Sequence, residues 1–96
     1  MKIQLNNSEL TASADVASSV HEEGVVLLRI SDGQMFASNV TGARIWCGLK
    51  ERLSLEVIIN NICNDYQIDE TTARGHVQRF LVELERQKLI QREISS

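Results

Sequence analysis

The spacing of apolar residues changes at Asn39, and this change limits the folds that the chain can adopt. Before Asn39, residues 25–30 form an apolar run rich in β-branched side chains, which is typical of a buried β-strand. After it, apolar side chains recur at helical spacing, beginning with Ile45, Trp46 and Leu49. A chain whose strands all precede its helices is expected to segregate the two into separate layers.

The first half of the chain predicts three short strands. Residues 11–19 have the small, alternating pattern of an edge strand, and residues 25–30 and 34–39 follow it. Residues 21–24 are predicted to form a turn. The Asp32-Gly33 step is a hairpin signal, because glycine accepts a positive φ angle without steric cost. The result is a small antiparallel sheet, and residues 1–10 are expected to be weakly ordered.

The second half predicts three helices, each preceded by a residue that can cap it. Asn39 or Thr41 can accept hydrogen bonds from the first free amides, and Ser54 and Asp69 serve the next two helices. The apolar residues of the second helix fall in one stripe: Leu55, Ile58, Ile59, Ile62, Cys63 and Tyr66. Those of the third helix are Ala73, Val77, Phe80, Leu81 and Leu84. The predicted order is β-β-β-α-α-α, in one α+β domain over residues 1–96.

Composition and charge exclude several classes of protein. Apolar residues at 43% and charged residues at 24% are ordinary for a folded soluble domain. No apolar run approaches the roughly 20 residues of a membrane-spanning helix, and the first residues lack a secretion signal, so we expect a cytoplasmic protein with no membrane partner. The chain carries 10 Lys and Arg against 13 Asp and Glu. This balance disfavours nucleic acid as a partner, because such binding depends on clustered cations.

No cluster of residues predicts catalysis or metal binding. Cys47 and Cys63 form no CxxC pair and lie in apolar helical patterns, so both are predicted to be small buried side chains. His21 lies in a predicted turn and His76 on the third helix, and neither has a second ligand one helical turn away. There is no glycine-rich phosphate loop. We therefore expect a protein that is not an enzyme and that uses neither metal nor cofactor.

The last predicted strand is suited to bind a peptide. An exposed sheet edge presents a row of unpaired backbone N–H and C=O groups. Residues 34–39 carry no charge and no proline, which are common means of blocking an edge, so an extended peptide could add there as a fourth strand. Side chains alternate along a strand, so Met35 and Phe36 cannot both face the core. We predict that Phe36 lies in the core and that Met35 is exposed, where its thioether suits adaptable contacts.

Three stretches of the sequence together carry a family resemblance. They are DGQMFASNVTGARIW, SLEVIINNICNDYQID and VQRFLVELERQKLI, and the most distinctive part is Asn39-x-Thr41-Gly42-Ala43-x-Ile45-Trp46. In this order and spacing they resemble the PqqD-like family, the recognition elements of ribosomal peptide natural-product pathways. The resemblance covers residues 25–90.

The resemblance implies both a fold and a function. Members of the family are not enzymes, adopt a winged-helix-like fold of three antiparallel strands against three helices, and bind the leader segment of a precursor peptide. The leader adds to the sheet along the third strand, in a groove bordered by the third helix, and maturation enzymes then act on the precursor. The Thr-Gly…Ile-Trp version resembles the lasso-peptide branch more than the coenzyme PQQ branch, and this implies a leader peptidase as partner, together with a cyclase or another maturation enzyme.

The residues expected to bind the peptide follow from this resemblance and from helix geometry. On the strand they are Gln34, Met35, Phe36, Ala37 and Ser38. On the third helix they are four residues at i, i+3, i+4 and i+7 that share one face: Arg74, Val77, Gln78 and Leu81. The spacing alone does not say which of the four are exposed.

Two positions depart from the family pattern that the resemblance implies. Ser38 stands where relatives usually carry leucine, which makes a contact near the strand end smaller or more polar. His76 stands where many carry aspartate. If that position touches the leader, its charge preference could differ and binding could depend on pH through the imidazole.

Trp46 is predicted to fill the angle between the last strand and the first helix, as a supporting residue that does not contact the peptide. An alternative function is a winged-helix DNA-binding or transcription-linked domain, because the same order of elements can place a helix in the major groove. The net charge of -3 and the anions interleaved on the third helix argue against that alternative.

Overall fold

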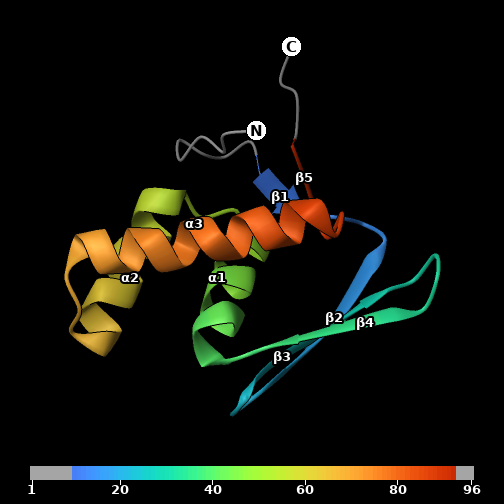
Figure 1. The fold of residues 1–96 in the computed structure, drawn as a ribbon, viewed down its shortest axis with the longest axis horizontal. Helices are drawn as coiled ribbons and strands as arrows, with labels where there is room; N and C mark the ends of the chain where they lie inside the picture. The colour runs from blue at the N-terminus through green and yellow to red at the C-terminus, as the bar shows by residue number, and fades with distance from the viewer. Residues whose placement is uncertain (1–9, 93–96) are drawn as a thin grey trace.

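The computed structural model describes residues 10–92, and this part of the chain folds into five strands and three helices (Figure 1). In chain order they are β1 Leu10–Ala12, β2 Val16–His21, β3 Gly24–Arg29, β4 Gln34–Ser38, α1 Val40–Lys50, α2 Leu55–Tyr66, α3 Glu70–Arg86 and β5 Ile90–Arg92. No helix among these residues is long and apolar enough to cross a membrane.

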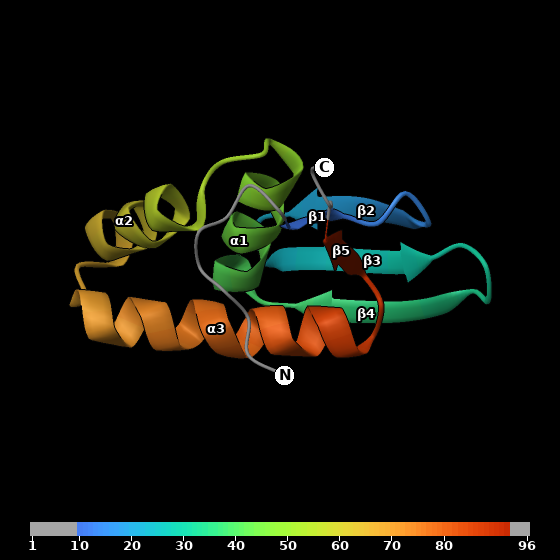
Figure 2. The ribbon, with the colours of Figure 1, turned by 90° about the horizontal axis from the view of Figure 1, so that it is seen from above.

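The main sheet has the order β2-β3-β4, with β3 in the centre and both pairings antiparallel (Figure 2). The β2–β3 hairpin closes with His21 opposite Gly24, and the β3–β4 hairpin closes with Arg29 opposite Gln34. Gly33 has a φ of 73°, and its N–H donates to the Arg29 carbonyl at 2.8 Å. The predicted three-stranded antiparallel sheet is confirmed.

One predicted strand is wrong in detail, since residues 11–19 form two strands instead of one. A turn interrupts them, in which the Val16 N–H donates to the Ser13 carbonyl at 3.2 Å and the Asp15 N–H donates to Ser13 Oγ at 3.1 Å. β1 leaves the main sheet and pairs antiparallel with β5, a strand that the sequence pattern did not reveal. Leu10, predicted to be weakly ordered, is buried in β1, and residues 1–9 lie outside the described part.

The helices cover one face of the sheet, and the core lies between the two layers. Val25 and Leu27 of β3 point into it, while Val26 and Leu28 remain partly exposed on the other face. α3 runs above β4 and along it (Figures 1 and 2). The predicted α+β arrangement of three strands and three helices is therefore present, with β1 and β5 added to it.

The helix starts agree with the capping residues that the sequence predicts. Asn39 Oδ1 accepts the Gly42 N–H at 3.0 Å, Ser54 Oγ accepts the Val57 N–H at 3.2 Å, and Asp69 Oδ1 accepts the Thr72 N–H at 2.9 Å. Of the two candidates for the first helix, Asn39 is thus the cap. These side-chain oxygens satisfy amides that have no partner within the helix.

Three predictions about buried residues have different outcomes. Trp46 is 1% exposed, which confirms it as a core residue. Cys47 and Cys63 are half-buried, so the prediction of full burial is wrong. Tyr66 ends the apolar stripe of α2 but is 38% exposed, because it lies in the last turn of the helix.

Candidate peptide-binding site

β4 is an edge strand within the described part of the chain. It pairs with β3 over residues 34–38, and no other described strand pairs with its outer side. Along such an edge, alternate residues direct their backbone N–H and C=O groups away from the sheet. The strand is without charge and proline, so neither of these blocks an added strand.

The side chains of β4 alternate as predicted. Phe36 packs partly buried against the core, whereas Met35 is 66% exposed. Ser38 is half-buried on the same side as Phe36, and Ala37 is exposed with Met35. The Arg29 guanidinium lies over the Phe36 ring, 5.3 Å from its centroid, a cation–π contact that holds the ring from the neighbouring strand.

Two glycines allow the end of β4 to lie close to its neighbours. A Cβ on Gly24, whose φ is 151°, would lie 1.9 Å from the Ser38 carbonyl oxygen. A Cβ on Gly42 would lie 2.1 Å from Ser38 Oγ and 2.7 Å from Ser38 Cβ. Real Cβ atoms do not approach heavy atoms so closely, so both positions require glycine for this backbone arrangement. The Thr41-Gly42 step is thus the place where α1 meets the strand.

A groove of about 310 Å³ begins where β4 ends and runs between α1 and α3. On one side it is lined by the strand end and the first turns of α1: Ser38, Asn39, Thr41, Gly42 and Ile45. On the other side it is lined by one face of α3: His76, Arg79, Phe80 and Glu83. Its apolar members are Phe80, which is partly exposed, and Ile45, which is 1% exposed, and its charged members come from α3.

The face of α3 that lines the groove is offset by two residues from the predicted face. Val77 and Leu81 are 0% exposed, so the prediction that they border the groove is wrong: they form the core beneath it. Gln78 is exposed but does not line the groove. The i, i+3, i+4, i+7 spacing of the predicted set also holds for residues 76, 79, 80 and 83. Spacing alone therefore could not decide which of the two helix faces lines the groove.

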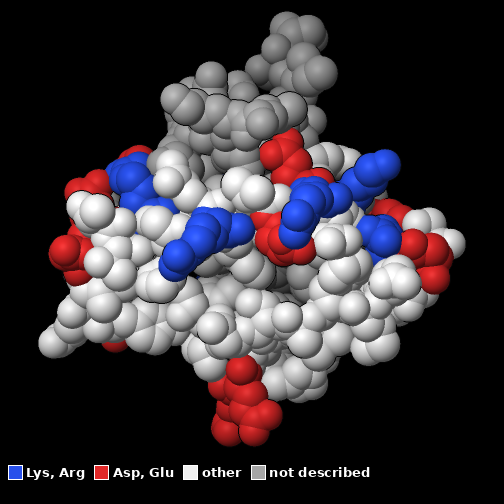
Figure 3. Space-filling view, viewed as in Figure 1, with Lys and Arg blue, Asp and Glu red and all other residues white. Residues whose placement is uncertain are grey.

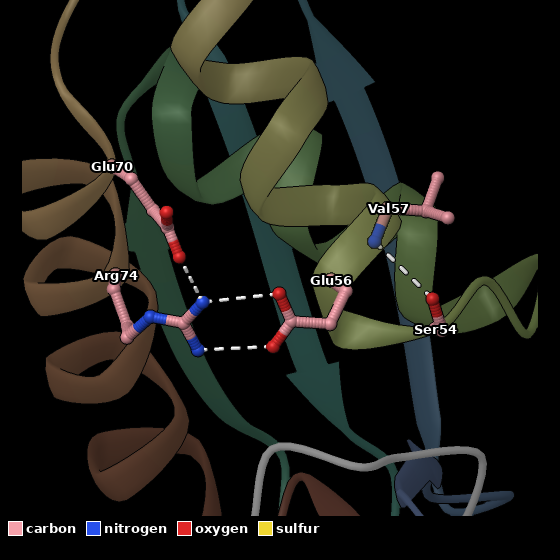
Figure 4. A network of polar contacts seen from close by, with 5 residues as sticks. All are labelled: Ser54, Glu56, Val57, Glu70 and Arg74. Carbon is pink, nitrogen blue, oxygen red and sulfur yellow. Dashed lines mark hydrogen bonds and ion pairs between the residues drawn. The ribbon is translucent and has the colours of Figure 1, made fainter.

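Arg74 faces α2 instead of β4 (Figure 4). Its two terminal nitrogens each donate to one oxygen of Glu56 at 3.0 Å, and one of them also contacts Glu70. The hydrogen bonds from Arg74 hold the pKa of Glu56 below its usual value. The role of Arg74 in this structure is to join α2 to α3, and the prediction that it borders the groove is wrong.

The charged side chains of the groove differ in their partners. Arg79 Nη2 lies 3.1 Å from His76 Nδ1. Glu83 accepts hydrogen bonds from Gln87 Nε2 at 3.1 Å and from Arg86 Nη2 at 2.6 Å, and these lower its pKa. Blue and red side chains are interspersed along the band where α3 runs (Figure 3), so this face carries no continuous basic stripe of the kind that tracks a nucleic-acid backbone.

Arg29 connects the groove-side elements at the other end of β4. Its side chain donates to both oxygens of Asp32, at 3.1 and 2.9 Å, and to the Gln87 carbonyl at the end of α3. Hydrogen bonds from Arg29 and from the Gln34 N–H lower the pKa of Asp32. Arg29 thus joins β3, beside the start of β4, to the end of α3. Among residues 10–92, no three His, Cys, Asp or Glu side chains are grouped to hold a metal ion.

These features define a small winged-helix-like α+β domain in which an unpaired strand lies beside a helix-lined groove. The chain belongs to the PqqD family, since the family described as "Coenzyme PQQ synthesis protein D (PqqD)" matches residues 24–90. The resemblance inferred from the sequence is thereby confirmed.

A solved structure shares the fold. It is described as "TbiB1 in Complex with the TbiA(beta) Leader Peptide", with a TM-score of 0.78 and 32% sequence identity, and the match covers 83% of this chain and 93% of that chain. A comparison with curated proteins found no match.

Proposed function

We propose that this protein is the recognition element of a ribosomal peptide pathway, which binds the leader segment of a precursor peptide. The observation that carries the proposal is the similarity to TbiB1, whose solved structure contains the TbiA(beta) leader peptide. The free outer side of β4 and the groove beside it supply a physical means of binding an extended peptide.

In this proposal the leader adds as a strand beside β4. Backbone hydrogen bonds would set the register, and each contributes roughly 0.5–1.5 kcal/mol net. These bonds do not depend on the leader's side chains, so selectivity would come from the groove at Ser38, where the partly exposed Phe80 can contact an apolar side chain. Because Gly24 and Gly42 fix the strand end, little backbone ordering would be needed on binding.

The chain itself is assigned no catalytic step. It would hold the precursor in the cytoplasm while separate enzymes act, namely a leader peptidase and a cyclase if the pathway makes a lasso peptide. The site consists of the edge of a strand and a groove, and its polar groups His76 and Arg79 are exposed at the surface. Such a site suits the binding of a peptide on which other enzymes act.

The decisive experiment is a scan with N-methylated leader peptides. The probes are the TbiA(beta) leader and the leaders of short precursors encoded beside the gene, titrated by fluorescence anisotropy. N-methylation removes one donor, so methylation of every second amide should weaken binding at least about fivefold, because those amides face β4. The amides between them face solvent, and their methylation should have a smaller effect.

Two results would count against the proposal. Failure of every leader to bind at high micromolar concentration would argue against leader recognition. Binding without the two-residue periodicity would argue against strand addition while leaving recognition intact. A gel shift with duplex DNA at low salt provides the control for the DNA-binding alternative, since DNA binding would be strong there and would collapse as salt is added.

A further inference from the structure

Arg79 differs from the other arginines for which the structure gives ion pairs. Those arginines each have a carboxylate partner within the fold: Arg29 with Asp32, Arg44 with Asp65, Arg74 with Glu56, and Arg86 with Glu83. Over residues 10–92, the hydrogen-bond partner of Arg79 is the imidazole ring of His76, and no carboxylate lies within ion-pair distance of Arg79. Its charge is therefore not compensated by the described part of the protein.

His76 fixes the direction of the Arg79 side chain. A guanidinium group can only donate hydrogen bonds, so His76 Nδ1, 3.1 Å from Arg79 Nη2, must act as the acceptor. This contact uses one N–H of the guanidinium group. The remaining N–H groups keep the fork geometry that binds a carboxylate through two parallel hydrogen bonds.

The position of Arg79 places this cation at the peptide groove. Arg79 lines the groove together with Phe80 and with Ser38, the last residue of β4. Glu83, the anion in the groove, lies one helical turn further along α3, and each of its oxygens already accepts a hydrogen bond, from Arg86 or Gln87. A carboxylate in the groove would therefore find unused donors on Arg79, whereas the oxygens of Glu83 are already hydrogen-bonded within the protein.

We infer that Arg79 selects an aspartate or glutamate in the bound peptide, with His76 as the residue that positions the guanidinium group. The inference rests on the proposed function and adds to it the chemical class of one side chain of the ligand. A protein of net charge -3 has no long-range attraction for an acidic peptide, so this preference has to be local. Exchange of the selected acid for its amide should lower the affinity about three- to tenfold.

The test is a selection of displayed random dodecapeptides against the wild-type protein, followed by titration of selected peptides and of their Asp→Asn or Glu→Gln versions. The same titrations are repeated with three variants. Arg79→Gln removes the cation, and His76→Asp supplies a carboxylate three residues before Arg79 on the same helix face. Arg44→Gln is the matched control, because it removes one positive charge from α1 at a position outside the groove.

Peptides selected by the wild-type protein should carry an acid at one position, and its amide version should bind more weakly. That difference should disappear in Arg79→Gln, shrink in His76→Asp and persist in Arg44→Gln. Selected peptides without an acidic position, or an amide penalty that Arg79→Gln leaves unchanged, would overturn the inference alone. A library that yields no binder would overturn the proposed function, and the inference with it.

Discussion

Replacement of Gly42 by alanine should lower both stability and peptide affinity, whereas the same replacement at Gly75 should raise stability. A Cβ on Gly42 would lie 2.1 Å from Ser38 Oγ, 2.7 Å from Ser38 Cβ and 3.1 Å from Phe80 Cε1. Rotation of the Ser38 hydroxyl relieves the first contact but not the second, so the strand or the helix has to move. A Cβ on Gly75 meets no heavy atom within 4 Å.

The magnitudes follow from two opposing effects. Alanine is more favourable than glycine within a helix by about 1 kcal/mol, and both residues are helical. At Gly75 this gain stands alone, so the free energy of unfolding should rise by about 0.5–1 kcal/mol. At Gly42 overpacking costs about 1–3 kcal/mol in addition. Gly42 lies in the first turn of α1 and Gly75 inside α3, so the helix gain at Gly42 is no larger than at Gly75. The two variants should therefore differ by at least about 1–3 kcal/mol, mainly through the steric term.

The assay is urea denaturation followed by far-ultraviolet circular dichroism, paired with leader titration. The Gly42→Ala variant should bind leader at least about threefold more weakly, because the displaced Ser38 and Phe80 line the groove. Gly75→Ala should bind as the wild type does. Equal free energies of unfolding for the two variants, together with equal affinities, would refute the argument that close contact at Ser38 shapes the site.

Three further predictions follow from other contacts. Hydrogen bonds from the Thr72 side chain and backbone lower the pKa of Asp69 in the folded protein. The stability that this carboxylate contributes is therefore present above its unfolded pKa, near 4, and is lost as pH falls through the folded pKa. Asp69→Asn keeps a cap that does not titrate, so its urea midpoint should fall less than that of the wild type between neutral pH and about pH 3; an equal fall would contradict this reasoning. Trp46→Ala should lower the free energy of unfolding by about 3–5 kcal/mol, because the side chain is 1% exposed and its removal leaves a cavity. A loss under about 1 kcal/mol in chemical denaturation would show that Trp46 does not stabilise the core. Arg29→Lys keeps the positive charge but loses the guanidinium group that donates to both Asp32 and the Gln87 carbonyl, so amide hydrogen exchange should accelerate at the end of α3. Unchanged exchange there would show that Arg29 does not hold the end of α3.

Most of the fold could be predicted because its signals are local. A capping side chain and an apolar stripe report on one helix at a time, and Asn39, Ser54 and Asp69 cap the helices that the sequence predicts. The β1–β5 pair could not be found in this way. Each strand has three residues, and what makes them strands is their pairing across the length of the chain.

The candidate site was only half predictable, for a related reason. Alternation along β4 correctly separated Met35 from Phe36, because the period of a strand leaves two faces to choose from. On α3 the residues that contact solvent depend on how the helix is rotated against α2 and the sheet. Arg74, predicted to border the groove, lies against Glu56. The sequence gives no sign of Arg79 as a groove residue, and it points to His76 only through the departure from the family pattern. Phe80 offers a sequence signal for the groove face, because this apolar residue lies beside the fully buried stripe of Ala73, Val77 and Leu81 and so marks the side of the stripe that borders the groove.

The pairing of β1 with β5 also determines how this unit can be joined to other proteins. Leu10 is the register partner of Arg92, so both ends of the described chain leave the molecule at one point. In Figure 1 that point lies beyond α3, on the side away from β4. The whole domain could therefore be grafted into a surface loop of a processing enzyme through a short two-stranded stalk, and the outer side of β4 would still point outward.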